Sequence, residues 1–361
     1  MKTKNYLLQA IALVSFAVLY FGAVQEARAD VSSCSSFSGI QMKRVTYYEN
    51  LSPPANDLRA SIDGNKPVIR LKGWLYFADG EMNKNKPVII YNHGHSDTRN
   101  EPCRLAKYFV EQGFVVFAPL RRGHSANTPS PKPADWQPIS STGVFTDDYV
   151  KNCLISGKCS CNVCGIELPA SGCKSNRYEV DYIRQQVSDV RQQINYIKDH
   201  DAINSSGKNT TGKLVNPDQI AVLGHSYGGS VIIFANAELD TQSVAISVSG
   251  AELSWGSDEP EWETELSCAM GSQKRPIYFL QPKNGRTLAP TKTLYGIAIN
   301  QKYRSQAAIF PPTAWDPLKI DDDTGLPELE YKQAHENFIS NADEIKGWGK
   351  SVKEFIERYP K

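Results

Sequence analysis

The sequence predicts an α/β protein with a mostly parallel, doubly wound sheet, and two observations support that fold class. Short apolar runs recur along the chain at intervals that leave room for helices between them. Some of these runs, including 87–91 and 114–117, are continuously apolar, as parallel strands buried on both faces are. We therefore expect helices to cover the sheet on both sides.

The predicted strands begin with an alternating pair that resembles an antiparallel hairpin and continue as the parallel part of the sheet. They are 43–48, 68–77, 87–92, 114–119, 218–223, 243–249, 275–281 and 305–310. The predicted helices are 102–112, 178–199 and 343–358. The second helix has one apolar stripe, formed by Tyr178, Ile183, Val187, Val190, Ile194 and Ile197.

Residues 128–176 interrupt this pattern of strands and helices. They open with prolines and continue as a cysteine-rich stretch whose apolar residues have no period. The spacing Cys159-x-Cys161-x-x-Cys164 is compatible with a zinc or redox cluster, but the stretch holds no histidine. We interpret the segment as an insertion after the fourth core strand that forms a small cap stapled by disulfides.

The first 29 residues have the features of a cleavable signal peptide. Lys2 and Lys4 precede an apolar stretch that ends in an Ala-x-Ala site before Asp30. A retained membrane anchor is the alternative, because the apolar stretch approaches spanning length. Cleavage predicts a secreted or periplasmic domain of residues 30–361 without membrane insertion, in which all 8 cysteines follow the cleavage site and disulfides are their expected use.

The charge balance bears on the expected partner. The chain has 40 basic and 39 acidic residues, a net charge of +1, which does not favour nucleic acid or acidic lipid. We expect a small-molecule substrate.

The most informative motif is Gly224-His-Ser-Tyr-Gly228, which lies between an apolar run and an apolar segment of helical length. Glycines at both ends relieve crowding in a sharp strand-to-helix turn and leave the hydroxyl of Ser226 exposed. The helix that follows directs its free N–H groups toward charge that develops during acyl transfer. The motif predicts Ser226 as a nucleophile.

A serine nucleophile needs a base, and a histidine that follows the last strand is the expected source. Of the 6 histidines, His335 has that place, in a loop just before the final helix. The oxyanion needs two N–H donors, for which we expect Tyr227 and His95, with Ser96 as the alternative to His95. His93 is expected to hold that loop together.

Other polar and aromatic residues are expected near the mouth of the pocket, at the carboxyl ends of the strands. Arg121, Arg122 and His124 follow the fourth strand and either contact substrate or tie loops together. Trp255 and Trp262 follow the sixth strand and either line the substrate pocket or pack in the core.

The acid that should orient His335 is absent from its usual position. The segment 282–290, after the seventh strand, contains no Asp or Glu. Glu252, after the sixth strand, is the alternative carboxylate, although it is equally compatible with a solvated loop residue. Asn284 could orient the imidazole but would not stabilise its positive charge as an anion does.

With these residues the chain resembles the α/β-hydrolase superfamily, and within it the dienelactone-hydrolase-like and prolyl-oligopeptidase-like esterases. The matching elements are Asn92-His-Gly94, Arg121-Arg-Gly-His124, Gly224-His-Ser-Tyr-Gly-Gly229, Phe279-Leu-Gln-Pro-Lys-Asn284 and Ala334-His-Glu-Asn-Phe338. The resemblance implies Ser226 as nucleophile, His335 as base, and the backbone amides of His95 and Tyr227 as the oxyanion hole. In such relatives an aspartate commonly follows the asparagine that matches Asn284, whereas this chain has Gly285.

The expected activity is that of a secreted serine hydrolase that cleaves a carboxylic ester through an acyl-enzyme on Ser226. No metal or organic cofactor is implied. A peptidase or amidase of the same fold is one alternative, disfavoured because amines are poorer leaving groups and usually need a strong acid, which is absent from its usual position. A non-catalytic binding protein that has lost the triad acid is the other.

Overall fold

The computed structural model describes Cys34 and residues 37–50, 61–63, 66–94, 102–121, 161–163, 166–168, 177–252, 254–255, 260–301, 304–310 and 330–361. The predicted signal peptide and nearly all of the predicted insertion lie outside the described residues. The chain divides into two compact units, Met1–Ser38 and Gly39–Lys361, and the fold below is that of the second.

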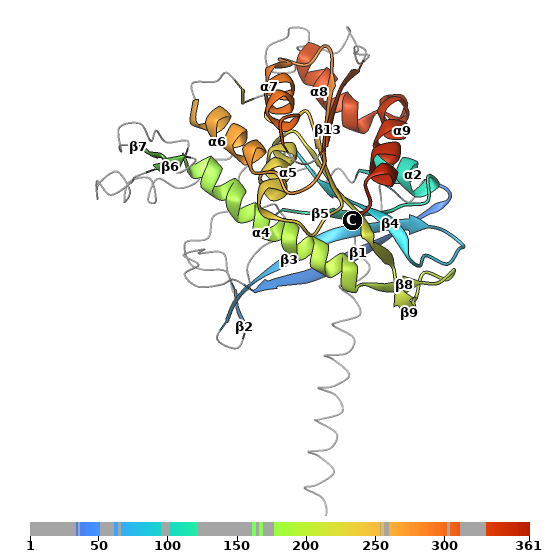
Figure 1. Ribbon diagram of the computed structural model, residues 1–361. Helices are drawn as coiled ribbons and strands as arrows, with labels where there is room; N and C mark the ends of the chain where they lie inside the picture. The colour runs from blue at the N-terminus through green and yellow to red at the C-terminus, as the bar shows by residue number, and fades with distance from the viewer. Residues whose placement is uncertain are drawn as a thin grey trace, which may run out of the picture. The chain divides into compact units, whose positions relative to one another are not determined.

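One mixed sheet forms the centre of this unit (Figure 1). Its strands, in spatial order, are β1 (Ile40–Asn50), β3 (Lys66–Ala78), β5 (Val115–Pro119), β4 (Lys86–Asn92), β10 (Val215–His225), β11 (Val244–Val248), β12 (Ile277–Pro282) and β13 (Ser305–Phe310). The short β2 (Ser61–Asp63) pairs with β3. The β1–β3 and β3–β5 pairs are antiparallel, and every later pair is parallel. The antiparallel start and the parallel remainder are as the sequence predicts.

The described helices form two packed groups. In one group, α4 (Arg177–Asp199), α5 (Tyr227–Glu238), α6 (Pro260–Gly271) and α7 (Ala289–Ala298) contact one another in succession. In the other, α2 (Cys103–Glu111) and α8 (Glu330–Ser340) pack against α9 (Ala342–Arg358). Both groups contact the sheet, so the doubly wound arrangement is confirmed.

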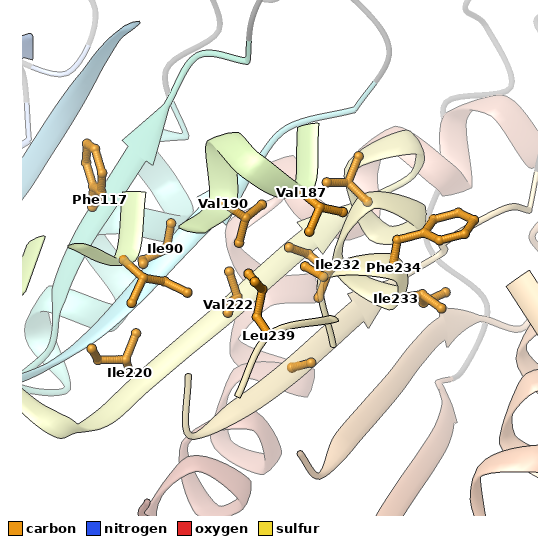
Figure 2. Close-up of a cluster of buried hydrophobic side chains, with 14 of the residues drawn as sticks. Ile90, Phe117, Val187, Val190, Ile220, Val222, Ile232, Ile233, Phe234 and Leu239 are labelled. Carbon is orange, nitrogen blue, oxygen red and sulfur yellow. The ribbon is translucent and has the colours of Figure 1, made fainter. Parts of the chain in front are cut away.

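The main hydrophobic core lies between the sheet and the first group of helices (Figure 2). Val187 and Val190 of α4 meet Ile232 of α5 above Ile90 and Val222 of the central strands. The predicted stripe of α4 is buried wherever its side chains are described, which is at Val187, Val190, Ile194 and Ile197. This packing fixes α4 and α5 on β10, and therefore fixes the turn that joins β10 to α5.

Several elements were not predicted from the sequence. They are α6, α7, the hairpin of β8 (Asp201–Ile203) and β9 (Asn209–Lys213), and a hairpin of β6 (Cys161–Val163) and β7 (Ile166–Leu168). The expectation that His335 lies in a loop is wrong, because residues 330–340 form α8. That helix is short and mostly polar, and among its described side chains only Ala334, His335, Phe338 and Ile339 are buried, so its apolar stripe is too brief to recognise.

Two further observations concern the cysteines and the helices. Cys34, Cys103 and Cys268 are disulfide-bonded, which agrees with the expected use of the cysteines. Within the described part of the chain, no helix is long and apolar enough to cross a membrane.

Candidate active site

Ser226 occupies the turn between β10 and α5, at the carboxyl end of the strand. Its backbone has φ 54° and ψ −120°, a conformation that is strained for a residue with a side chain. A Cβ at Gly224 would lie 2.7 Å from the nitrogen of Gly229, and a Cβ at Gly228 would lie 2.5 Å from the oxygen of His93. The turn therefore requires both glycines, and it leaves Ser226 partly exposed.

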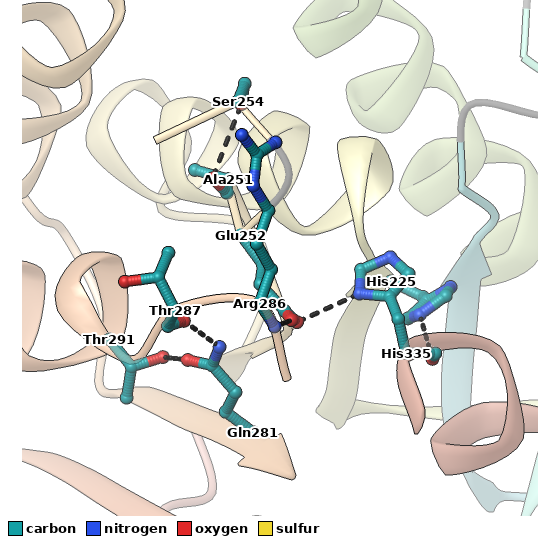
Figure 3. Close-up of polar contacts among 9 residues, drawn as sticks. All are labelled: His225, Ala251, Glu252, Ser254, Gln281, Arg286, Thr287, Thr291 and His335. Atoms are coloured by element: carbon teal, nitrogen blue, oxygen red, sulfur yellow. Dashed lines mark hydrogen bonds and ion pairs between the residues drawn. The ribbon is translucent and has the colours of Figure 1, made fainter. Parts of the chain in front are cut away.

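His335 lies on α8, and its side chain is hydrogen-bonded to Glu252, which lies in the loop after β11 (Figure 3). Nδ1 of His335 is 2.9 Å from Oε2 of Glu252, and the side chains are 1% and 0% exposed. Because a carboxylate oxygen only accepts, Nδ1 is the donor of this bond, and in the neutral ring Nε2 then keeps its lone pair. Nε2 is buried and has no hydrogen-bond partner among the described residues.

The second carboxylate oxygen of Glu252 also accepts a hydrogen bond. Oε1 accepts a hydrogen bond from the backbone N–H of Arg286 at 2.5 Å. Two residues of the loop that carries Glu252, Ser249 and Ala251, have positive φ angles of 50° and 63°. A non-glycine residue adopts this conformation only where the surrounding structure holds it. The carboxylate is therefore held by two donors from distant segments and by a constrained loop.

His225 links the serine turn to α8. Its Nε2 donates to the backbone oxygen of His335 at 3.0 Å, and the two imidazole rings are 4.6 Å apart between centroids. Burial and the neighbouring His335 hold the pKa of His225 well below its ordinary value. The ring is therefore neutral, with its proton on Nε2. No hydrogen bond joins Ser226 to Nε2 of His335 within the described residues, although the residue before Ser226 contacts His335 directly.

The loop after β4 also approaches the serine turn. A Cβ at Gly94 would lie 3.4 Å from both the Cβ of Ser226 and Nδ1 of His225. The guanidinium of Arg121 donates to the backbone oxygens of His93 and Gly94, and the Arg121 N–H donates to Nε2 of His93 at 3.3 Å. The predicted role of His93 in this loop agrees with these bonds. His95 and Ser96 lie outside the described residues.

The geometry of Arg121 agrees with one of its two expected roles, which is to tie loops together. The side chain is 1% exposed, and its guanidinium carbon lies 5.0 Å from the centroid of the Tyr227 ring. It thus connects the loop after β4 to the residue that follows Ser226. Arg122 and His124 lie outside the described residues.

The two tryptophans after β11 are part of the hydrophobic core. Trp255 is 9% exposed and Trp262 is 3% exposed, and both belong to the cluster that includes α4 and α5. Trp262 stacks on Tyr227, with ring centroids 6.5 Å apart and planes 25° from parallel. Of the alternatives weighed from the sequence, core packing describes both residues.

Of the two residues proposed to orient His335, the structure brings Glu252 to the imidazole. Asn284 lies in the turn after β12. Sequence reasoning missed His225, Gly285 and the N–H of Arg286. A usable signal existed for Gly285, because a residue without a side chain stands where the resemblance implies an aspartate. Among the described residues, no group of three or more His, Cys, Asp or Glu could hold a metal ion.

The strand order places an antiparallel pair before six parallel strands, with the serine turn at the end of β10 and a helix directly after it. The histidine follows the last strand on α8, and a carboxylate from the loop after β11 meets it. The chain has the α/β-hydrolase fold. The segments that carry Ser226, Glu252 and His335 therefore lie together at the carboxyl edge of the parallel strands.

Comparison with solved structures gives similarities at low identity. The α/β-hydrolase GrgF from Penicillium sp. sh18 is 12% identical, with a TM-score of 0.48 over 89% of this chain and 99% of that one. The esterase Pf2001 of Pyrococcus furiosus is 13% identical, with a TM-score of 0.47 over 89% and 91%. The acylaminoacyl peptidase of Pyrococcus horikoshii is 15% identical, with a TM-score of 0.47 over 90% of this chain but 43% of that one. No family model and no curated protein matches the sequence.

Proposed function

We propose that this α/β-hydrolase is a serine esterase in which Ser226 is the nucleophile, His335 the general base and Glu252 the acid. The observation that carries the proposal is the buried bond between Glu252 and Nδ1 of His335. A carboxylate at Nδ1 fixes the tautomer that leaves Nε2 able to take a proton, and it stabilises the imidazolium that results.

The reaction follows from these roles. Nε2 of His335 removes the proton of Ser226, and the serine oxygen attacks the carbonyl carbon of the ester. The negative charge that forms on the carbonyl oxygen is stabilised by the N–H of Tyr227, at the start of α5, and by the N–H of His95. The imidazolium then protonates the leaving alcohol from Nε2. In the second half of the reaction Nε2 removes a proton from water, the water oxygen attacks the acyl carbon, and the bond to Ser226 breaks as the serine takes the proton back, which releases the carboxylic acid.

The position of Glu252 changes the weight of the two alternatives. The alternative of a non-catalytic binding protein rests on the absence of a carboxylate at 285. The buried carboxylate of Glu252 contacts the imidazole of His335 instead, which weakens that alternative. The same contact removes one of the two reasons against amide cleavage, the missing acid. We retain the ester as the substrate because an alcohol leaves more easily than an amine, and amide cleavage is the second outcome to test.

The test combines covalent labelling with turnover. We expect a fluorophosphonate probe to label the folded protein at Ser226 and the Ser226→Ala variant to remain unlabelled. The wild type should hydrolyse p-nitrophenyl acetate and butyrate, and acyl p-nitroanilides in parallel will measure amide cleavage. A folded wild type that is neither labelled nor active would refute the proposal, and faster turnover of the anilides would replace the esterase by an amidase.

A further inference from the structure

Position 285 has no room for a side chain, and the obstacle is the carboxylate of Glu252. A Cβ built on Gly285 would lie 2.8 Å from Cδ of Glu252, 3.1 Å from its Oε2 and closer still to its Oε1. Non-bonded carbon and oxygen atoms do not approach so closely without displacement, because the contact is far inside the optimal separation of about 3.5–4.0 Å. Any side chain at 285 must therefore move the group that bonds His335.

The carboxylate cannot move aside without losing a bond. Its Oε2 is bonded to Nδ1 of His335 at 2.9 Å, and its Oε1 is bonded to the N–H of Arg286 at 2.5 Å. The Glu252 side chain is fully buried, and the Gly285 backbone is held by its N–H bond to the oxygen of Pro282 at 3.2 Å. A displaced carboxylate would leave a buried imidazole N–H without its acceptor.

The backbone conformation of Gly285 does not itself require glycine. Its φ is not positive, in contrast to Gly113 and Gly207, where φ is 88° and 75°. Alanine can therefore adopt the backbone of residue 285 without strain. The three atoms nearest to a Cβ at this position all belong to the side chain of Glu252, which is therefore the obstacle.

We propose that Gly285 is a positioning residue, whose missing side chain creates the space in which the Glu252 carboxylate meets His335. This inference rests on the proposed function, because it concerns the acid of that site. A side chain at 285 and the carboxylate of Glu252 would occupy the same space, so only one of the two positions can supply the carboxylate that meets His335. Since a Cβ at residue 285 would lie 2.8 Å from the carboxylate carbon of Glu252, we expect an aspartate at 285 to bring its own carboxylate close to Nδ1 once Glu252 is truncated.

The test is a double-mutant cycle on p-nitrophenyl acetate hydrolysis with Glu252→Ala, Gly285→Ala and the two combined. Loss of the acid should lower kcat by roughly 10³–10⁴-fold, and Gly285→Ala by about 10–100-fold with little change in KM. In the Glu252→Ala background, Gly285→Ala should have no further effect, because the group that it displaces is gone. Glu252→Ala with Gly285→Asp should recover at least about tenfold of the lost kcat.

Gly296→Ala is the matched control, because a Cβ there meets nothing within 4 Å and φ is not positive. It should leave kcat unchanged. If Gly285→Ala alone does not fold, the combined variant with Glu252→Ala should fold, since the clash is removed. Equal losses from Gly285→Ala in both backgrounds, an unaffected Gly285→Ala enzyme, or misfolding in both backgrounds would each overturn the proposal.

A readout without turnover separates this inference from the proposed function. The Nδ1–H of His335 bonded to a carboxylate should give a strongly downfield imidazole proton signal in NMR spectra of the wild type and of Gly296→Ala. The signal should disappear in Glu252→Ala and Gly285→Ala and return in Glu252→Ala with Gly285→Asp. If the wild type is inactive but follows this pattern, the proposed function fails and the role of Gly285 stands. A signal unchanged by Gly285→Ala refutes that role.

Discussion

Nε2 of His225 donates a hydrogen bond to the backbone oxygen of His335, 110 residues further along the chain. His225, which directly precedes the proposed nucleophile, is thus hydrogen-bonded to the main chain of His335, the proposed base. The bond lies on the main chain of α8, so it positions the helix and leaves both nitrogens of the His335 ring for the acid and the serine.

We expect His225→Leu to lower kcat by about tenfold with little change in KM, because a loosened α8 misplaces the base relative to the bound ester. His225→Gln keeps an N–H that can reach the carbonyl oxygen and should retain most of kcat. Steady-state kinetics on p-nitrophenyl butyrate will measure both variants. Equal losses in the two variants would show that the ring itself, and not its donor, is required.

His225 also predicts how stability depends on pH. Its pKa in the folded protein lies well below the unfolded value of about 6.5, so below that pH the unfolded chain binds a proton that the folded chain does not. The free energy of unfolding should therefore fall as pH decreases below about 6.5, by at most about 1.4 kcal/mol per pH unit from this group.

Urea denaturation at several pH values between about 5 and 7 will measure this slope, which His225→Gln should make shallower. The pKa of His200 is also lowered by burial, but His200 is present in both proteins and cancels from the comparison. His200→Gln is the control for a less buried histidine. An identical slope in the wild type and His225→Gln would contradict a proton-free His225.

The strained backbone of Ser226 predicts a conflict between stability and activity. Glycine adopts a φ of 54° without cost, so Ser226→Gly should raise the free energy of unfolding by about 1 kcal/mol while abolishing probe labelling. Ser226→Ala keeps a Cβ and should leave stability near that of the wild type. Chemical denaturation of the three proteins tests this, and a Ser226→Gly variant no more stable than Ser226→Ala would show that the turn is unstrained.

Arg121 predicts a loss of activity without direct contact with the reacting atoms. Arg121→Lys cannot donate to the oxygens of His93 and Gly94 in the same geometry, because an ammonium lacks the planar fork. We expect kcat to fall by about 10–100-fold through a displaced loop after β4, with melting temperature lowered as well. An unchanged kcat in a destabilised Arg121→Lys protein would limit the role of Arg121 to folding.

The parts of the fold and site that the sequence predicted are those with local signatures. The serine turn is specified by two glycines that act within five residues, and the strands and α4 by periodic apolar residues. Glu252 remained ambiguous because its role depends on where three separate segments meet, and nothing in residues 249–252 distinguishes a buried carboxylate from a solvated one. The contact of His225 with His335 was missed for the same reason. From the sequence, Gly285 shows only that the usual aspartate is absent. In the structure, its lack of a side chain leaves room for the carboxylate of Glu252.

The donor that holds Oε1 of Glu252 belongs to the peptide backbone of Arg286 and not to its side chain. Nineteen of the amino acids have a backbone N–H at this position, whatever their side chain, and only proline lacks it. Any residue other than proline at 286 therefore keeps this hydrogen bond to Glu252. The active variants of a saturation library at 286 should be depleted in proline. A main-chain contact hides a functional constraint from any survey of side-chain identity.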